Sequence, residues 1–217
     1  MGLRSFVALP VDKGGSVVRF QIESNQDQDT DHAIVNGAYG LSANQTLLLG
    51  LPYRLSPSGS ERLGDLGVLY RYTIMQNDFR EGTHRLGLLG GIVVPMDSDR
   101  DAAIQAGLVS THFRGRNEWD IDVLYRAGMG IRLDSGRYDI SWQFRLTPEH
   151  YPDWGIDQEL NSVLELGGRW NEGNETIHQV TIGLQWIHPT WVLEGGVFQD
   201  INGPKDTHFL LSTRVHF

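Results

Sequence analysis

The sequence predicts an all-β protein, a transmembrane antiparallel up-and-down β-barrel of about 12 strands. First, segments of about ten residues alternate apolar and polar side chains, and successive side chains of a strand face opposite sides. Second, the polar positions carry charges in mid-strand, which suits a polar lumen better than a second buried face. Third, the final segment alternates to its end, with Phe209, Leu211, Thr213, Val215 and Phe217 on one face.

Composition narrows the classes of protein that fit. The chain has 217 residues, 40% hydrophobic and 21% charged, and its mean hydropathy is −0.30. A barrel tolerates this composition because only every second residue must be apolar, and no run approaches the roughly 18 apolar residues of a spanning helix. The absence of cysteine excludes disulfides and thiolate sites. The net charge of −9 argues against nucleic acid as a partner, since phosphate binding needs clustered Lys and Arg.

The expected strands follow one another along the chain, each bounded by turn residues. The first six cover residues 16–23, 31–40, 45–54, 65–75, 83–94 and 102–114. The first of them sets Val18, Phe20 and Ile22 against three polar residues, and the fourth sets Tyr70 and Tyr72 against an arginine and a threonine. This period of two is the pattern of a strand with one apolar face.

The last six expected strands cover residues 118–127, 137–146, 157–170, 176–187, 190–199 and 208–217. The segment 118–127 alternates most regularly, because every apolar residue from Trp119 to Tyr125 is followed or preceded by a charged one, except at Leu124. The apolar faces of the next four contain Tyr138, Ile140, Trp142 and Phe144; Leu160, Leu164 and Leu166; Val180, Ile182, Leu184 and Trp186; and Trp191, Leu193 and Val197.

An even number of strands places both ends of the barrel sequence on the periplasmic side. The loops after odd-numbered strands are acidic and rich in Gly, Ser and Asn, as expected of cell-facing loops; they are residues 25–30, 55–64, 95–101, 128–136, 171–175 and 200–205. The turns expected on the periplasmic side are residues 41–44, 77–82, 115–117, 147–156 and 188–189.

The chain divides into residues 1–15, a leader of uncertain structure, and residues 16–217, a single transmembrane β-barrel domain. The first residues show no secretory signal, so for an envelope protein we expect that a signal has been removed and that Met1 is not native to the mature chain. A cytoplasmic origin would argue against the membrane barrel. The competing fold is a soluble β-sandwich or lipocalin-like barrel, which places its apolar residues inward. Mid-strand charges, and Trp and Tyr near strand ends as in an interfacial girdle, argue against it.

The terminal face from Phe209 to Phe217 resembles the assembly signal of bacterial outer-membrane barrels. Several segments also resemble the family of outer-membrane transporters named for the MetA pathway of phenol degradation. The segments that carry this resemblance are Gly64-Asp65-Leu66 before Leu69-Tyr70-Arg71-Tyr72, the run from Leu86 to Pro95, Gly40 to Gln45, His188 to Glu194, Asn202-Gly203 and Phe217. The resemblance implies a channel for small molecules, hydrophobic ones included, with no agreed substrate, and it brings no catalytic residue. Pro95-Met96-Asp97 departs from the family's usual Pro-Thr-Gly, so loop function is not carried over.

Charged residues on the polar faces are the candidate functional residues. Those expected to face the lumen are Arg19, Glu23, Arg54, Asp65, Arg71, Glu118, Asp120, Asp122, Arg126, Asp139, Arg145, Glu165, Arg169, Glu194 and Arg214. They fit a network of ion pairs that fills and stiffens the lumen, because buried charges need partners. They also fit the lining of a narrow charged conduit. Arg145 is a candidate cross-strand neighbour of Asp120 and Asp122, although the sequence does not give the register.

No pattern predicts a metal or another cofactor. Asp27, Asp29 and Asp31, like Asp97, Asp99 and Asp101, begin as a calcium loop does, but neither set continues with the glycine and glutamate that such a loop needs. We interpret them as solvated loops, with weak divalent bridging to lipopolysaccharide as the alternative. The histidines lack metal-ligand spacing.

Three functions remain open. The first is an outer-membrane channel with passive diffusion of small molecules through a narrow charged lumen, and the second is a structural or assembly barrel of an envelope complex. The third is an outer-membrane lipid hydrolase, suggested only by Ser110 and His112 on one face of a strand, without an orienting acid or an oxyanion site. The expected partners are outer-membrane lipid, lipopolysaccharide, the barrel assembly machinery and, in the second case, an envelope protein.

Overall fold

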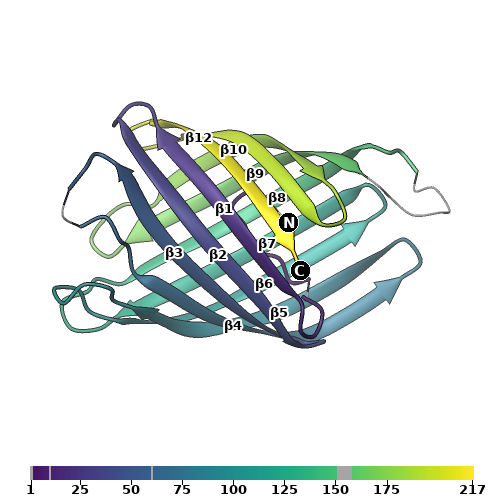
Figure 1. Ribbon diagram of the computed structural model, residues 1–217, viewed down its shortest axis with the longest axis horizontal. Coiled ribbons are helices and arrows are strands. Elements are labelled where there is room, and N and C mark those ends of the chain that lie inside the picture. The colour runs from purple at the N-terminus through teal and green to yellow at the C-terminus, as the bar shows by residue number, and fades with distance from the viewer. Residues whose placement is uncertain (1, 10, 60, 151–157) are drawn as a thin grey trace.

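The computed structural model describes all residues except 1, 10, 60 and 151–157, and the described residues form one closed antiparallel barrel (Figure 1). The twelve strands are β1 (Ser16–Asn25), β2 (Thr30–Ser42), β3 (Gln45–Ser56), β4 (Leu66–Phe79), β5 (Gly82–Val94), β6 (Ala103–Arg114), β7 (Asn117–Gly128), β8 (Ser135–Thr147), β9 (Glu159–Asn171), β10 (Ile177–Ile187), β11 (Trp191–Asp200) and β12 (Thr207–His216). The predicted all-β barrel with about 12 strands is confirmed. Among these residues no helix is long and apolar enough to cross a membrane.

Each strand pairs with its neighbours in sequence, and β1 closes the ring by pairing with β12. The closing register sets Val18 opposite Val215 and Gln21 opposite Ser212. At the end of this seam, Ser16 and Phe217 exchange two backbone hydrogen bonds, of 3.1 and 2.9 Å. Closure leaves no strand without a neighbour on both sides, although β3 and β4 pair over six residues only, from Gln45 to Gly50. A barrel in lipid needs such closure because lipid offers no hydrogen-bond partner.

Most strands extend further than the sequence predicted, so most turns are shorter. β4 reaches Phe79 and β5 begins at Gly82, which reduces the expected turn 77–82 to two residues. The β6–β7 turn is equally tight and contains Gly115 at φ 61°, a conformation that suits glycine. The expected ninth strand begins at Glu159, and residue 157, where we expected its start, lies outside the described residues.

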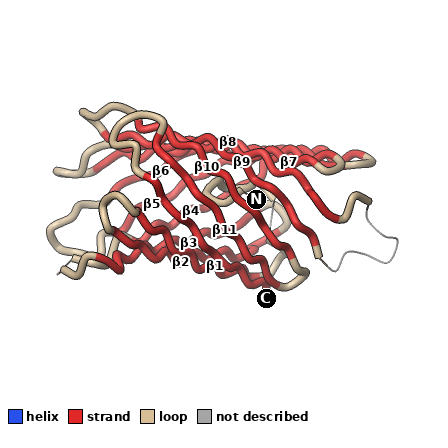
Figure 2. The backbone as a smooth tube through the Cα atoms, turned by 90° about the horizontal axis from the view of Figure 1, so that it is seen from above, coloured by secondary structure: helices blue, strands red, loops and turns tan. Residues whose placement is uncertain are grey.

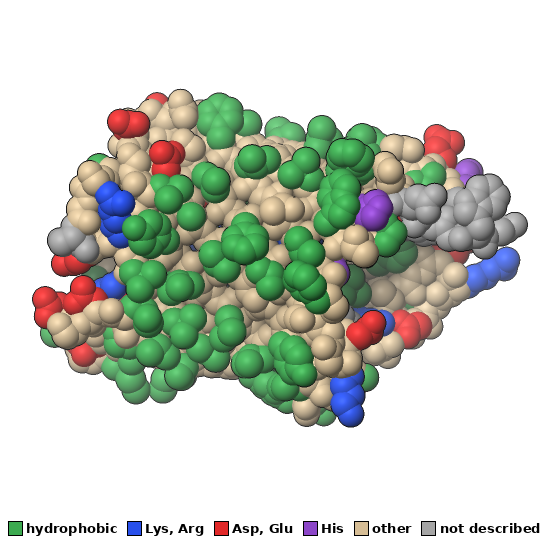
Figure 3. Space-filling view, in the orientation of Figure 1, with side chains coloured by type: hydrophobic (Ala, Val, Ile, Leu, Met, Phe, Trp, Pro, Cys, Tyr) green, Lys and Arg blue, Asp and Glu red, His purple; other side chains and the backbone are tan. Residues whose placement is uncertain are grey.

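The face of the barrel shown in Figure 3 is apolar in the middle and carries its charged side chains toward the two ends. Outward-facing side chains such as Ile121, Val123 and Leu184 are about half exposed because nothing in the barrel covers them. Aromatic side chains mark the boundaries of this zone. Trp186 packs edge-on against Trp191 at one end, with ring centroids 5.1 Å apart. An apolar band with aromatic residues at its border is typical of a barrel surface that a bilayer covers.

The leader enters the barrel. Gly14, at φ 81°, turns the chain into β1, and its N–H donates to the carbonyl of Gly40 at 2.8 Å. Before this turn, the described residues of the leader lie inside the ring of strands, as the loop that carries the N label shows in Figure 2. Ala8 packs in a buried cluster with Leu69 and Val109, and Leu3 in another with Val163.

The apolar exterior gives the first prediction. Val123 lies outward in the middle of β7 and is 51% exposed. We expect Val123→Arg to lower the free energy of unfolding by about 2–4 kcal/mol, because arginine is costly at the bilayer midplane. Denaturant titration in phospholipid vesicles, read by the mobility of folded and unfolded bands, measures the change. Val123→Ala is the control, and an arginine variant as stable as this control would contradict a lipid-facing surface.

Candidate functional site

Most of the charged residues that the sequence analysis expected in the lumen are buried or partly buried on inward-facing positions of their strands. Buried below 10% exposure are Arg19, Arg71, Asp120, Asp122, Asp139, Arg145, Glu165, Glu194 and Arg214. Partly buried on the same inward parity are Glu23, Arg54, Glu118, Arg126 and Arg169. Asp65 precedes β4 and pairs with Arg100 at 2.9 Å and with Arg132 at 2.7 Å. At the same end, the Tyr125 hydroxyl and the Gly128 N–H donate to Asp134 in the β7–β8 loop and lower the pKa of that carboxyl.

One ion cluster lies beside the closing seam. Glu194 on β11 accepts from Arg214 on β12 and pairs with Arg19 on β1, each at 2.7 Å. The hydroxyl of Ser212 also donates to Glu194. The side chain of Glu194 is fully buried, so one carboxylate joins the last two strands to the first in a place that bulk water does not reach.

A second cluster lies across the β7–β9 wall. Arg137 pairs with Asp122 at 3.3 Å and with Asp139 at 3.2 Å, and Arg169 pairs with Asp139 at 2.8 Å. The sequence analysis missed Arg137 as an inward charge, although Arg137 shares the parity of Asp139. Parity was the signal that could have found it; we had taken Arg137 only as the start of a strand.

The register decides which charges meet between β7 and β8. Asp120 lies opposite Ser141 and Asp122 opposite Asp139. The cross-strand neighbour that we expected for these aspartates, Arg145, is therefore not opposite either of them; its Nη2 donates instead to the carbonyl of Gly115 at 3.3 Å. Arg137 is the arginine that pairs with Asp122, whereas the Asp120 carboxylate accepts from Thr111 and Gln143.

The backbone N–H groups of the leader donate to side chains of the lumen wall. Residues 2–9, which we call the N-terminal plug, run through the barrel interior. The N–H of Arg4 donates to Glu165 at 3.1 Å, that of Phe6 to Asp122 at 2.8 Å and that of Ala8 to the Thr111 hydroxyl at 2.9 Å. These acceptors stand on β9, β7 and β6, so the plug crosses the lumen.

The carbonyl groups of the plug accept from arginines. Arg19 donates to the carbonyl of Leu3, and Arg71 donates to those of Val7 and Leu9, the latter at 2.6 Å. Arg71 forms no ion pair with a carboxylate among the described residues; the plug carbonyls and the Thr46 hydroxyl are its partners. Lumen charges thus pair partly with each other and partly with the plug backbone.

Shape holds the plug as well. A Cβ added to Gly196 would lie 2.8 Å from the Leu3 Cδ1 atom, and one added to Gly183 would lie 2.5 Å from it. These glycines are opposite one another on β10 and β11. Leu3 therefore fills the space that two absent side chains leave in the wall.

A cavity of about 540 Å³ occupies the lumen beside the plug. Its lining includes Arg4 and Phe6 of the plug, and it extends to Asp65, Arg132 and Asn171 at the strand ends that carry the loops after odd-numbered strands. The described part of the lumen is thus open over part of its length and occupied by residues 2–9 over the rest.

The two residues that suggested a lipid hydrolase, Ser110 and His112, do not face the lumen. Ser110 and His112 share the outward face of β6, and the Ser110 hydroxyl contacts Nε2 of His84 on β5 at 3.3 Å. His112 stacks edge-on with His84, with ring centroids 5.6 Å apart. Among the described residues no carboxylate contacts either histidine, so the arrangement lacks the orienting acid that nucleophilic catalysis needs.

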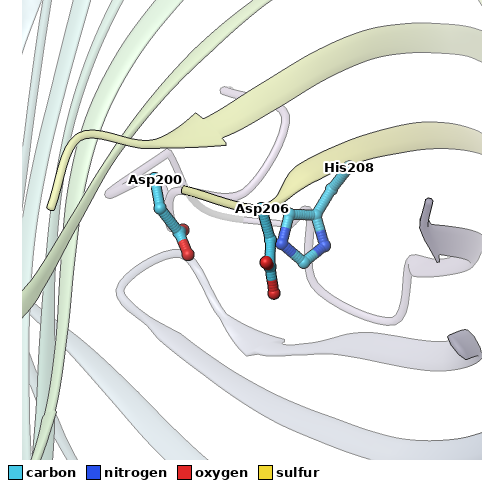
Figure 4. A group of neighbouring side chains, drawn as sticks. All are labelled: Asp200, Asp206 and His208. Carbon is cyan, nitrogen blue, oxygen red and sulfur yellow. The ribbon is translucent and has the colours of Figure 1, made fainter. Parts of the chain in front are cut away.

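The cluster of metal-ligating side chains in the described chain is Asp200, Asp206 and His208 (Figure 4). One ligand atom from each lies within 4.8 Å of the others. The two carboxylates already accept hydrogen bonds from side-chain amides. Gln179 donates to Asp200 at 2.6 Å, and Asn25 donates to Asp206 at 3.0 Å. His208 stacks on a phenylalanine ring at 4.3 Å. These contacts hold the cluster together without an ion, and they assign it no metal.

The aspartate triplets lie largely at the loops. Asp97 accepts from the N–H of Asp99 at 3.1 Å, and Asp27 accepts from that of Thr207 at 2.7 Å. The first is a local turn contact, and the second joins the β1–β2 loop to the start of β12; both contacts are exposed. Bridging of divalent ions to lipopolysaccharide stays a prediction.

Comparison with solved structures gives the class of fold. The COG4313 outer membrane channel from Pseudomonas putida F1 is 16% identical, with a TM-score of 0.57 over 100% of both chains. The NanC porin is 10% identical with a TM-score of 0.59, over 91% of this chain and 98% of the porin. The KdgM porin in complex with disordered oligogalacturonate is 9% identical with a TM-score of 0.57, over 93% of this chain and 99% of the porin.

These likenesses show the fold alone: the chain has the β-barrel fold of outer-membrane channels and porins. It matches no protein-family model, and no curated protein matches it in sequence. The resemblance to the phenol-degradation family therefore rests on the short sequence segments alone.

The Glu194 cluster gives the second prediction. Glu194→Gln leaves Arg19 and Arg214 without their shared carboxylate, and we expect it to lower the free energy of unfolding by about 3 kcal/mol, as breaking a buried pair does. Glu149→Gln is the matched control. It breaks an exposed pair with Arg116, 3.4 Å apart, and should cost under about 1 kcal/mol. Equal effects in a denaturant titration would mean that the Glu194 cluster is solvated.

Proposed function

We propose that the protein is a bacterial outer-membrane channel for small molecules. The observation that carries the proposal is the lumen cavity of about 540 Å³, which a polar wall surrounds and an apolar exterior encloses. A barrel whose only role was structural would have no need of such a cavity. The fold shared with outer-membrane channels and porins supports the proposal.

In this proposal residues 2–9 hold the channel in a closed or narrowed state. Diffusion through the lumen requires them to move, which they can do without the loss of any strand because no strand includes them. The wall residues that bind the plug, Arg71, Asp122 and Glu165, then become the charged lining of the conduit.

The second candidate is a structural or assembly barrel in an envelope complex. The occupied lumen favours it, since a permanently bound plug would prevent transport. The channel proposal is preferred because the cavity continues past the plug to one end of the barrel.

The remaining assignments belong to the same proposal. The protein lies in the outer membrane in contact with lipid and lipopolysaccharide, and the assembly machinery recognises its terminal strand from Phe209 to Phe217. It belongs to the transporter family named for the MetA pathway, and it is not an enzyme. Equal lipase and deacylase activity of the wild type and Ser110→Ala would exclude a hydrolase that uses Ser110, and absence of activity in both would support the last assignment.

Removal of the plug gives the third prediction. Deleting residues 2–9 takes away no strand, and we expect it to raise the single-channel conductance in planar bilayers several-fold, because it opens the occupied section of the lumen. Leu3→Ala is the milder variant. It removes the side chain that Gly183 and Gly196 accommodate, and we expect more frequent opening at unchanged maximal conductance.

Val197→Ala is the control for Leu3→Ala, because Val197 faces outward on β11 and is 41% exposed. Its conductance should equal that of the wild type. If neither the deletion nor the wild type conducts while both are folded by gel mobility, the channel proposal is wrong and the structural candidate replaces it.

A further inference from the structure

Arg126 differs from the other arginines of the cavity. It lies on β7, and its Nε donates to Gln105 at 3.0 Å. Its two Nη groups make no hydrogen bond or ion pair with any described residue, although the side chain lines the cavity. A guanidinium offers a fork of donors that matches a carboxylate, and here the fork faces open space.

The surroundings of Arg126 make an external anion favourable. Three like charges, Arg132, Arg137 and Arg169, interact with it electrostatically, and Asp65 is the carboxylate that opposes them. Each of these three arginines already pairs with an aspartate. Seven arginines and two carboxylates line the cavity in all. A half-buried positive charge without a partner attracts an anion more strongly than an exposed one, because water screens it less.

The wall across from β8 and β9 has a different character. In a ring of twelve strands β2 and β3 lie opposite β8 and β9. On that side Ile34 and Leu48 line the cavity, and Leu69 and Val93 on β4 and β5 continue this apolar surface. The cavity therefore offers Arg126 and its three arginine neighbours on the β7–β9 side and an apolar patch on β2 to β5, while Arg19 and Arg214 line it on β1 and β12.

We propose that this cavity is a binding site for small organic anions with an apolar body, with the carboxylate on Arg126 and the body against Ile34, Leu48 and Leu69. The inference deepens the proposed function, on which it rests, by naming the class of molecule that the channel takes. It also modifies the expectation drawn from the family resemblance, because a purely hydrophobic solute would leave Arg126 without a partner.

Calorimetric titration of the full chain in detergent tests the site with three probes. Hexanoate has both the charge and the apolar body, hexanamide lacks the charge, and acetate lacks the body. We expect hexanoate to bind about tenfold more tightly than either of the other two, since a charged hydrogen-bonded contact and a buried alkyl chain each contribute at least this factor.

Two variants locate the site. Arg126→Gln should weaken hexanoate binding about tenfold and leave hexanamide binding unchanged. Arg114→Gln makes the same change of charge at an exposed position at the other end of the barrel, and it should bind hexanoate as the wild type does. Equal binding of hexanoate by Arg126→Gln and wild type would overturn the proposal, and so would equal binding of hexanoate and hexanamide by the wild type. The second comparison needs no variant to fold.

The binding test and the conductance test distinguish failure of the anion site from failure of the channel proposal. If hexanoate binds as expected but no current passes through the wild type or the variant lacking residues 2–9, the channel proposal is wrong and the anion site stands. If current passes but hexanoate does not bind, the anion site is wrong and the channel proposal stands.

Discussion

A closed barrel in lipid must satisfy the charges of its lumen from within, and the rest of this structure depends on that constraint. Most of the inward Arg, Asp and Glu side chains are buried, and a buried charge costs free energy unless a partner inside the ring compensates it. Two carboxylates, Glu194 and Asp139, each bind two arginines. The backbone of residues 2–9 serves several of the others. The plug is thus part of the charge balance of the lumen as well as an obstacle in it.

This balance links stability to gating. When the plug leaves, Arg71 loses the carbonyls of Val7 and Leu9, and Glu165 loses the N–H of Arg4. Water or a solute must then replace these contacts. A solute with a carboxylate can accept hydrogen bonds from an arginine, whereas a hydrophobic solute cannot. The arginines that bind the plug carbonyls in the closed lumen therefore also favour anionic solutes in place of the plug. Among the described residues, Arg126 makes no hydrogen bond with the plug. In the proposed anion site it prefers a carboxylate even in the closed state.

The sequence predicts the barrel well because a strand with lipid on one face repeats every two residues. Alternation assigned the twelve strands and the inward parity of charges such as Asp120 and Arg214. It could not give the register, which is why Arg145 was expected beside Asp120 and why the contact of Ser110 with His84 was missed. Nor could it place the leader, because residues 2–9 bind the wall mainly through their backbone N–H and carbonyl groups, which leave no mark on the side-chain pattern.

The central claim is that residues 2–9 lie in the lumen, and cross-linking tests it most directly. The chain has no cysteine, so the pair Leu3→Cys and Gly196→Cys is the one thiol pair present. Leu3 reaches to within 2.8 Å of the place where a Gly196 side chain would begin, close enough for a disulfide after small adjustments. Mild oxidation in vesicles should join residues 3 and 196, as mass spectrometry of the linked peptides would detect, and reduction should reverse the link. Two free thiols after oxidation, with residue 3 readily labelled by a membrane-impermeant reagent, would contradict the account.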